Sequence, residues 1–353
     1  MQMNSMINKY RLAAEWEPQS AVLLSLPHPD TDWNYMLPQV HECYVRILRA
    51  LIYCDASPVL LVPDKEYAKN SLPPDVLEGV RLIEAEYNDT WIRDYGPLTL
   101  RSTDESGQRQ IRMADFGFNG WGLKFAADKD NLVTRSIFGP GSTAKFSVAY
   151  RDFLGYVLEG GSVESDGMGT LLTTSRCLCS LNRNGGLSKP QIEDILSKTL
   201  GINHFLWLDH GALQGDDTDS HIDTLARICP NDTILYTGCS DKADPQFKEL
   251  SLMATELQKL RTPDGKAYKL VELPLPAPIY DKDDGHRLPA TYANYLITDK
   301  AVLLPVYAQP DLDKTASEAV QSVYPDREII SIDCRPLIRQ HGSLHCATMQ
   351  LNK

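Results

Sequence analysis

Short strand-like runs alternate with helical patterns along the whole chain, and this alternation restricts the sequence to an α/β architecture. Residues 21–26 and 58–62 are apolar runs typical of strands, and apolar side chains recur at helical spacing over residues 40–51 between them. Ser188 followed by Pro190 predicts the start of a helix that ends at Gly201. Further strands are expected at 80–83, 97–100, 156–158, 170–173, 204–208, 295–298, 301–306 and 329–332, and further helices at 247–260 and 316–323.

No linker rich in Pro, Gly or Ser and no shift of composition divides the 353 residues, so we predict one α/β domain over residues 1–353. Lys and Arg number 35 against 47 Asp and Glu, a formal net charge of -12. Such an acidic surface repels phosphate backbones and excludes nucleic acid as the expected partner. No window approaches the roughly 20 apolar residues of a membrane-spanning helix, so no membrane association is expected.

The eight cysteines are spread through a long chain whose first residues lack the apolar core of a secretory signal. Cysteines in such a chain are expected to be reduced thiols, so we predict a cytoplasmic protein.

Four segments have polar residues concentrated in expected turns, which indicates a functional role more than a structural one. They are residues 88–97 (NDTWIRDYGP), 158–162 (LEGGS), 215–223 (GDDTDSHID) and 341–346 (HGSLHC).

The segment 215–223 has more than one interpretation. It can be a solvated acidic loop, or a metal site, because His and Asp are common ligands. It is not an EF-hand loop, since the required order of ligands and the closing Glu are absent. Extended geometry would place His221 and Asp223 on one face, as a general acid/base beside a carboxylate requires. The ligands of the metal interpretation are Asp216, Asp217, Asp219, His221 and Asp223.

Cys346 can be a buried structural thiol or a nucleophile exposed in a turn, and the neighbouring Gly342 and Ser343 favour the turn. Spacing alone does not separate His345, His341 and His221 as its partner. A free thiol is only slightly ionised at pH 7, so a nucleophilic role needs a nearby cation, which a cationic substrate could supply.

These segments, in this order, resemble the agmatine deiminase group of the guanidine-modifying (pentein) superfamily, to which bacterial peptidylarginine deiminases are related. The resemblance covers essentially the whole chain, and the ordered set of motifs is far more specific than any one of them. It implies a five-bladed, pseudo-symmetric α/β propeller of ββαβ units around a central channel. The motifs are residues 15–18 (EWEP), 27–28 (PH), 91–97 (WIRDYGP), 115–122 (DFGFNGWG), 158–162 (LEGGS), 216–223 (DDTDSHID), 292–295 (YANY) and 344–348 (LHCAT).

Position by position, the resemblance implies Cys346 as the nucleophile and His221 as the general acid/base. It implies Asp94 and Asp223 as the carboxylates that hold the guanidinium, and Glu159 as the carboxylate beside the histidine. Two carboxylates suit this role because they can bind the N–H groups of a planar cation bidentately. The chain departs from the common pattern at Ser220, where Gly is usual, and at residues 341–343 (HGS), which replace a Gly-rich approach to the cysteine.

Substrate contacts outside this set are less restricted by the sequence. Trp91, Asn119 and Trp121 are candidates to line the alkyl chain of the substrate, with packing at the rim as the alternative. Asp217, in preference to Asp219, could receive a terminal ammonium.

Asn294 could form hydrogen bonds near the site or shape a structural turn. The expected partner is a small cationic guanidine, and no metal or other cofactor is required. A homodimer would be usual for the family.

The expected activity is hydrolysis of agmatine to N-carbamoylputrescine and ammonia through an amidino group on the cysteine. Free or peptidyl arginine is an alternative substrate, although free arginine would need a cation for its α-carboxylate. An amidinotransferase could use the same intermediate. Outside this chemistry, the chain could be a metal-dependent protein that uses the 216–223 cluster, or a binding protein without activity.

Overall fold

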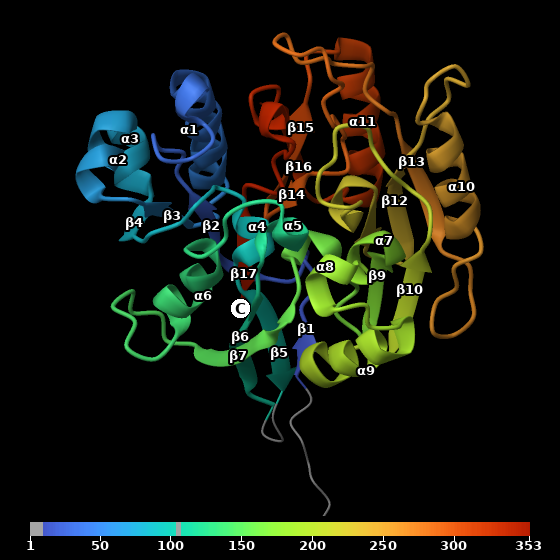
Figure 1. Cartoon of the computed structure of the whole chain (residues 1–353), viewed down its shortest axis with the longest axis horizontal. Helices are drawn as coiled ribbons and strands as arrows, with labels where there is room; N and C mark the ends of the chain where they lie inside the picture. Colours follow the sequence, from blue (N-terminus) through green and yellow to red (C-terminus); the bar gives the residue numbers. More distant parts are fainter. Residues whose placement is uncertain (1–9, 104–106) are drawn as a thin grey trace, which may run out of the picture.

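The computed structural model describes residues 10–103 and 107–353 (Figure 1). Within these ranges the strands form five small sheets, and helices pack outside them. In spatial order the sheets are β1 (Arg11–Leu12), β5 (Leu98–Thr103), β6 (Arg109–Gly117), β7 (Ala149–Val157); β10 (His204–Leu208), β9 (Thr170–Thr174), β8 (Glu164–Ser165); β11 (Ala226–Cys229), β12 (Thr233–Thr237), β13 (Lys269–Leu273); β14 (Leu296–Ile297), β15 (Ala301–Val306), β16 (Glu328–Asp333); and β17 (Met349–Asn352), β2 (Gln19–Ser25), β3 (Pro58–Val62), β4 (Arg81–Glu84).

One pattern of pairing recurs in every sheet. A first strand pairs antiparallel with a second, and the second pairs parallel with a third. The same order holds for β5, β6 and β7 and for β17, β2 and β3. A parallel pair needs a crossover connection. The crossovers contain, in chain order, α1 (Leu37–Tyr53), α6 (Asp130–Phe138), α9 (Lys189–Leu200), α10 (Phe247–Leu257) and α11 (Pro310–Val323).

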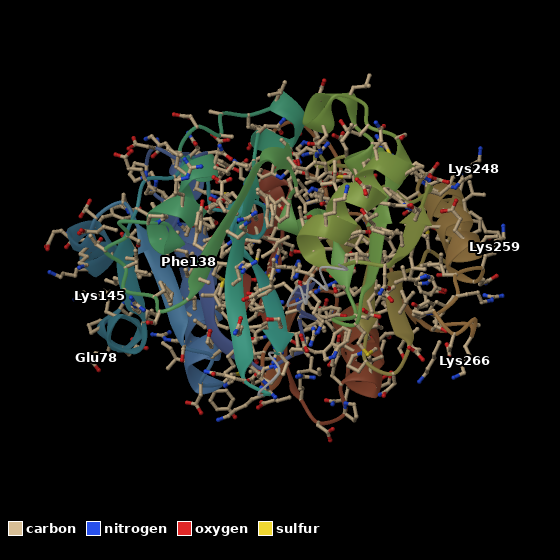
Figure 2. The ribbon with its side chains drawn as sticks, turned by 90° about the horizontal axis from the view of Figure 1, so that it is seen from below. Glu78, Phe138, Lys145, Lys248, Lys259 and Lys266 are labelled. Carbon is tan, nitrogen blue, oxygen red and sulfur yellow. The ribbon has the colours of Figure 1, made fainter. Side chains whose placement is uncertain are left out.

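The remaining helices are short. Some of them lie within the same crossovers, such as α5 between β6 and β7, and the others connect one sheet to the next or one strand to the next. They are α2 (Lys65–Ser71), α3 (Pro74–Gly79), α4 (Ile92–Tyr95), α5 (Gly120–Leu123), α7 (Ser175–Leu178) and α8 (Leu181–Asn184), with 3₁₀ turns η1 (Asn34–Met36), η2 (Gly160–Ser162), η3 (Ile222–Thr224) and η4 (Leu337–Gln340). No helix in the described ranges is both long enough and apolar enough to cross a membrane. Charged side chains such as Glu78, Lys145, Lys248, Lys259 and Lys266 point away from the ribbon at its periphery (Figure 2).

The recurring pattern brings five segments of the chain to equivalent places. Each segment lies directly before the first strand of a sheet, and each carries polar side chains that the sequence marked as candidates. The segments are α4 before β5, residues 159–162 before β8, residues 221–224 before β11, residues 291–295 before β14, and residues 343–348 before β17. Candidates that are hundreds of residues apart in the chain are therefore collected at one place.

The sequence prediction of α/β alternation is confirmed, and β3 and β10 have the predicted bounds. The predicted helix from Ser188 to Gly201 is also confirmed, with a capping box at Ser188 and a left-handed Gly201. Strands β6, β11, β12 and β13 and helix α6 were not predicted. Strand β11 carries the fully buried Arg227 where an apolar residue would be expected, which disguises its period.

Arg227, on β11, connects its own sheet to three others from the inside. Its Nη1 donates to the backbone oxygens of Ala293 (2.9 Å) and Tyr295 (2.7 Å), which precede β14. Its Nε donates to Glu164 in β8, and its Nη2 donates to Glu15, which follows β1. Only 1% of the Arg227 side chain is exposed, so these partners replace its hydration completely.

We expect Arg227→Met to lower the free energy of unfolding by about 3–5 kcal/mol, because it leaves buried carboxylates without a counter-charge. Urea unfolding followed by circular dichroism measures this loss. The matched control is Arg49→Met, which breaks an exposed ion pair with Asp75 on α1 and α3 and should leave the unfolding midpoint unchanged. Equal midpoints for the two variants would contradict a structural role for the Arg227 contacts.

Candidate active site

A cavity of about 110 Å³ has Cys346 in its wall, together with Trp91, Asp94, Trp121 and Asp217. The Cys346 side chain is buried at this wall, so the expectation of a thiol exposed in a turn is wrong. The segment that precedes β17 is covered because its backbone contacts Asn294 and Arg93. The cavity brings this thiol next to open space.

The position of Cys346 is fixed through its backbone and its sulfur. Its backbone N–H and its Sγ both face Oδ1 of Asn294, at 3.3 and 3.4 Å, and its carbonyl accepts from the N–H of Arg93 at 3.2 Å. Sγ also lies 3.7 Å from Oδ2 of Asp223. Burial, followed by the charges of Asp223 and Asp94, raises the pKa of the Cys346 thiol well above its usual value.

His221 is fully buried between two carboxylates. Its Nε2 lies 3.1 Å from Oε2 of Glu159, and its Nδ1 lies 3.5 Å from Oδ1 of Asp94. Nδ1 has no hydrogen-bond partner in the described residues. Burial alone would lower the pKa of His221, but Asp94, then Cys177 and Glu159, raise it well above the usual value. The imidazolium form, with an unused proton on Nδ1, is therefore favoured.

Asp94 lies on α4 and faces the same space. Its Oδ2 accepts from Nε1 of Trp121 at 2.9 Å, and its Oδ1 accepts from the N–H of Gly161 at 2.9 Å. Burial raises the pKa of Asp94 to about 6, with the negative charges of Asp223 and Glu159 adding to the increase and His221 opposing it. A cation bound here would offset that increase.

Asp223 lies in η3 and is also fully buried. Its Oδ2 lies 2.7 Å from Nδ1 of His345, while its Oδ1 has no partner among the described residues. Burial opposes ionisation, but the hydrogen bond and charge of His345, followed by His221 and Arg227, lower the pKa of Asp223 below its usual value. Asp223 thus stays ionised with one oxygen unused.

Gly161 marks the point at which these side chains converge. A Cβ at this position would lie 2.7 Å from Nδ1 of His221, 2.8 Å from Oδ1 of Asp94 and 3.0 Å from Oδ2 of Asp223. Any larger residue would therefore displace the three polar groups. The expected shared face of His221 and Asp223 is achieved in a way that the sequence did not predict, because residues 222–224 form a 3₁₀ turn and not an extended strand.

Glu159 lies beside His221, as the resemblance implied, and it has a second partner that the sequence analysis missed. Nε of the buried Arg183 lies 2.9 and 2.8 Å from the two oxygens of Glu159. Burial opposes ionisation of Glu159, but His221 and Arg183 lower its pKa below the usual value. Arg183 belongs to α8, where neither hydrophobic period nor motif distinguishes a buried arginine from an exposed one.

The two candidates for the substrate tail have different surroundings. Asp217 lines the cavity, and burial raises its pKa. Asp219 instead accepts from Arg183 at 2.6 Å and from Lys124 at 2.8 Å. These two cations already neutralise Asp219, so the expectation that it receives a terminal ammonium is corrected in favour of Asp217.

The cavity has further acidic and aromatic walls. Trp91 and Trp121 line it as expected, and Asp32, Asp89 and His341 join them. Burial raises the pKa of Asp89 to about 7, and the charge of Asp32 adds to the increase. Asp89 belongs to the 88–97 motif, and this membership could have indicated that it lies at the site. The sequence around Asp32 gave no such indication.

Of the two asparagines expected near the site, Asn294 lies at its centre and Asn119 has a structural role in a loop. Oδ1 of Asn119 accepts from the N–H of Gly122 at 3.0 Å, and Nδ2 donates to the carbonyl of Asn182 at 2.8 Å. Asn119 therefore holds the loop that carries Trp121, and the expectation of a substrate contact is corrected. Asn294 lies at the centre, because its Oδ1 faces both the backbone N–H and the Sγ of Cys346.

The metal interpretation of the 216–223 cluster is not supported by the geometry. Asp216 accepts from the backbone and hydroxyl of Thr218 and from the N–H of Ser220, and Asp219 is paired with Arg183 and Lys124. Two other groups in the described residues do bring three metal-capable side chains within 4.8 Å, but an arginine donates to a carboxylate in each. These groups are Glu159, Cys177 and His221, with Arg183, and Glu15, Glu164 and His345, with Arg227.

Comparison with known proteins shows which family the chain belongs to. The model of the Porphyromonas-type peptidyl-arginine deiminase family matches residues 11–351. A provisionally named agmatine deiminase from Photobacterium profundum is 32% identical, and the alignment covers 98% of this chain and 96% of that protein. The chain belongs to the Porphyromonas-type peptidyl-arginine deiminase family, one of the guanidine-modifying α/β proteins.

Solved structures show the same similarity. A cysteine-to-serine variant of C. jejuni agmatine deiminase with substrate bound is 32% identical, with a TM-score of 0.89 over 100% of this chain and 99% of that chain. Enterococcus faecalis agmatine deiminase is 28% identical, with a TM-score of 0.85 over 98% and 96%. A provisionally named arginine deiminase from Porphyromonas gingivalis is 47% identical, with a TM-score of 0.88 over 98% and 99%.

We expect His221 to remain an imidazolium at pH 8, where an ordinary histidine is neutral, because Asp94 and Glu159 stabilise its charge. ¹⁵N NMR of histidine-labelled protein reports this state, with the signal assigned from a His221→Gln variant. Asp94→Asn should bring the titration towards the usual range. His41, whose pKa burial lowers, is the internal control and should be neutral at pH 8. A neutral His221 at pH 7 would contradict the assigned electrostatics.

Proposed function

We propose that this protein hydrolyses agmatine to N-carbamoylputrescine and ammonia through a covalent amidino intermediate on Cys346. One observation carries the proposal: the carboxylates of Asp94 and Asp223 converge with Nδ1 of His221, and Oδ2 of Asp223 lies 3.7 Å from Sγ of Cys346. Among the described residues, Nδ1 of His221 and Oδ1 of Asp223 are buried without a hydrogen-bond partner. A buried polar atom without a partner costs about 1–3 kcal/mol, so such atoms indicate a ligand. A planar cation with N–H groups on both edges fits two carboxylates.

In the first half of the reaction, the guanidinium lies between Asp94 and Asp223. Each carboxylate contributes about 4 kcal/mol of attraction at roughly 4 Å and an effective dielectric constant near 20, before desolvation is subtracted. The bound cation lowers the pKa of the Cys346 thiol, which releases its proton to solvent, and the thiolate attacks the guanidinium carbon. His221 donates its Nδ1 proton to the departing amine, the C–N bond breaks, and ammonia leaves.

In the second half, neutral His221 accepts a proton from water, and the resulting hydroxide attacks the amidino carbon on Cys346. The C–S bond breaks, the thiolate is restored, and the ureido product leaves. The proton that the product releases accompanies ammonia as ammonium, so a dication and water give a monocation and ammonium. Glu159, held by Arg183, keeps His221 in one orientation through both steps.

The cavity wall favours agmatine over arginine. Asp32, Asp89, Asp94 and Asp217 line it, and none of the described residues that line it is Lys or Arg. Free arginine would bring an α-carboxylate among these acids, and Lys124, which donates to the carbonyl of Asp217, is already paired with Asp219. Agmatine instead brings an ammonium. The relatives include proteins named for either activity, and the charge of the wall supports the agmatine assignment.

We also propose the finer architecture that the resemblance implied. The five sheets, each with an antiparallel pair followed by a parallel pair, would be the blades of a pseudo-fivefold propeller in one catalytic domain over residues 1–353. Support comes from the recurring pairing pattern and from the five candidate-bearing segments at equivalent places before the first strands.

Cys346→Ser should abolish turnover while agmatine still binds, because the carboxylates remain and only the nucleophile is lost. Release of ammonia and ureido product measures turnover, and calorimetry measures binding. Cys54→Ser, at a buried free cysteine that follows α1, is the matched control and should keep wild-type turnover. Substantial turnover by Cys346→Ser would contradict the covalent mechanism. Consumption of agmatine by the wild type without ammonia or ureido product would indicate transfer of the amidino group to another amine.

The acid side of the pH profile should depend on Asp94. Its pKa is about 6 in the free protein, so it is ionised above that pH and neutral below it. We therefore expect kcat/KM for agmatine to fall by about tenfold per unit below pH 6, where the clamp loses a negative charge. Asp94→Asn should lower kcat/KM by about 100-fold or more and remove this dependence. An unchanged acid limb in Asp94→Asn would contradict the clamp.

A further inference from the structure

Glu15, from the EWEP motif near the start of the chain, lies at the catalytic centre, although the proposed reaction does not use it. Its Oε1 is 2.7 Å from Nε2 of His345 and 3.0 Å from Nη1 of Arg93, and its Oε2 accepts from Arg227. Only 15% of the Glu15 side chain is exposed. The Glu15 carboxylate therefore fixes the side chains that it binds. One of these is His345, which directly precedes the nucleophile Cys346.

His345 is held between two carboxylates. Its Nδ1 faces Oδ2 of Asp223 and its Nε2 faces Oε1 of Glu15, each at 2.7 Å. Its backbone N–H donates to Oδ1 of Asn294 at 2.9 Å, so both ring and backbone are fixed. The ring donates to both carboxylates only when both nitrogens carry protons. Burial and the charges of Arg227 and Arg93 oppose that form and lower the pKa of His345, and the two carboxylates offset this effect only in part.

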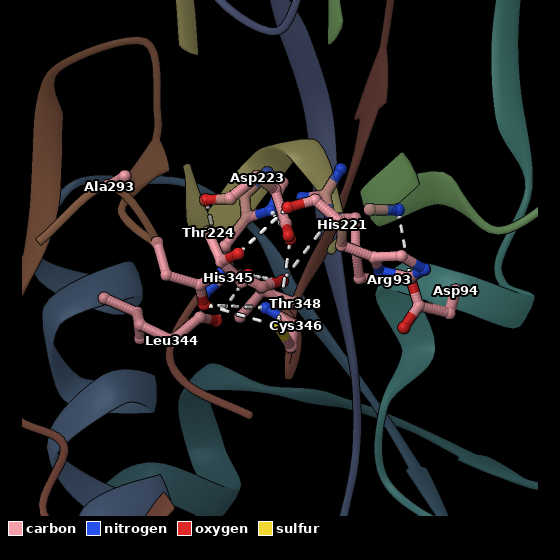
Figure 3. Close-up of polar contacts among 12 residues, drawn as sticks. Arg93, Asp94, His221, Asp223, Thr224, Ala293, Leu344, His345, Cys346 and Thr348 are labelled. Carbon is pink, nitrogen blue, oxygen red and sulfur yellow. Dashed lines mark hydrogen bonds and ion pairs between the residues drawn. The ribbon is translucent and has the colours of Figure 1, made fainter. Parts of the chain in front are cut away.

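The contact with His345 restricts the orientation of the Asp223 carboxylate. With Oδ2 bound by His345, the carboxylate cannot rotate freely, and this same oxygen is held 3.7 Å from Sγ of Cys346 (Figure 3). Its other oxygen, Oδ1, has no hydrogen-bond partner among the described residues. His345 also keeps Asp223 ionised. The other charged or titratable groups that act on Asp223 are His221, Arg227, Glu164, Asp94 and Cys346.

We propose that His345, anchored by Glu15, is a positioning residue that holds the Asp223 carboxylate ionised and in one orientation beside Cys346, where it receives the guanidinium. The inference rests on the proposed function, because it specifies how one arm of the carboxylate clamp is aimed. It also gives the EWEP motif a role, since Glu15 reaches His345 across 330 positions of the sequence.

The test compares two substitutions of His345. His345→Leu removes both ring contacts, whereas His345→Asn keeps an N–H near the position of Nδ1 and can still bind Asp223. His41→Asn is the matched control, because His41 is a half-buried histidine with a contact to the carbonyl of Pro27. For each variant, kcat and KM for agmatine are measured from pH 5 to 9, with thermal unfolding as a check of the fold.

We expect His345→Leu to lower kcat/KM at pH 7 by about 100-fold and to raise KM. Loss of His345 raises the pKa of Asp223, so the acid limb should move up by about one pH unit and become steeper, since Asp94 titrates there as well. His345→Asn should lose less than about tenfold and keep the wild-type limb. Equal losses in both variants with an unmoved limb would indicate packing alone and overturn the proposal.

Two further measurements keep the proposal testable. If His345→Leu does not fold, Glu15→Gln replaces it, since it keeps an acceptor for Nε2 but removes the charge; an unmoved acid limb would then overturn the proposal. If the wild type does not turn over agmatine, the proposed function fails by itself. Calorimetric binding of guanidinium chloride at pH 6 to the wild type and to His345→Leu then tests the clamp, and the affinity should weaken about tenfold in His345→Leu. Equal affinity in the two proteins would overturn the inference.

Discussion

A buried cluster of opposite charges holds the centre of this molecule in place. Glu15 lies between the guanidinium groups of Arg93 and Arg227, and Glu164 binds Arg227 from another sheet. Taking such charges out of water is unfavourable, and only complete mutual pairing makes it tolerable. The pairing therefore permits little variation in the arrangement of the sheets. The segments that carry Asp94 and Cys346 begin at this cluster, so the positions of the reactive groups depend on it.

Acidic groups are buried together at the catalytic centre next to this cluster. Glu159 is paired with Arg183 and Asp223 with His345, whereas Asp94 shares His221 with Glu159. The guanidinium of the proposed substrate would bring Asp94 a counter-charge. Burial and the neighbouring carboxylates account for two properties of the free protein: Asp94 ionises at a raised pKa, and the pKa of the Cys346 thiol is raised until a cation arrives.

The motifs in the sequence predicted most of this centre because its residues belong to short segments of distinctive composition. Cys346, His221, Asp94, Asp223 and Glu159 all lie where the segments converge. Their partners were harder to predict. The sequence of α8 gives no sign that its arginine is buried against Glu159, and it therefore could not show that Asp219 is already neutralised.

The sequence by itself determined the α/β alternation, the acidic character of the chain and the types of side chain available for the chemistry. These follow from local periodicity and composition, which each segment carries independently. Only the tertiary structure decided which oxygens are occupied and which are free. Oδ2 of Asp223 is bound by His345 while Oδ1 is not, and His345 is held by a glutamate 330 residues away. Those choices arise from contacts between distant segments, and no local pattern encodes them.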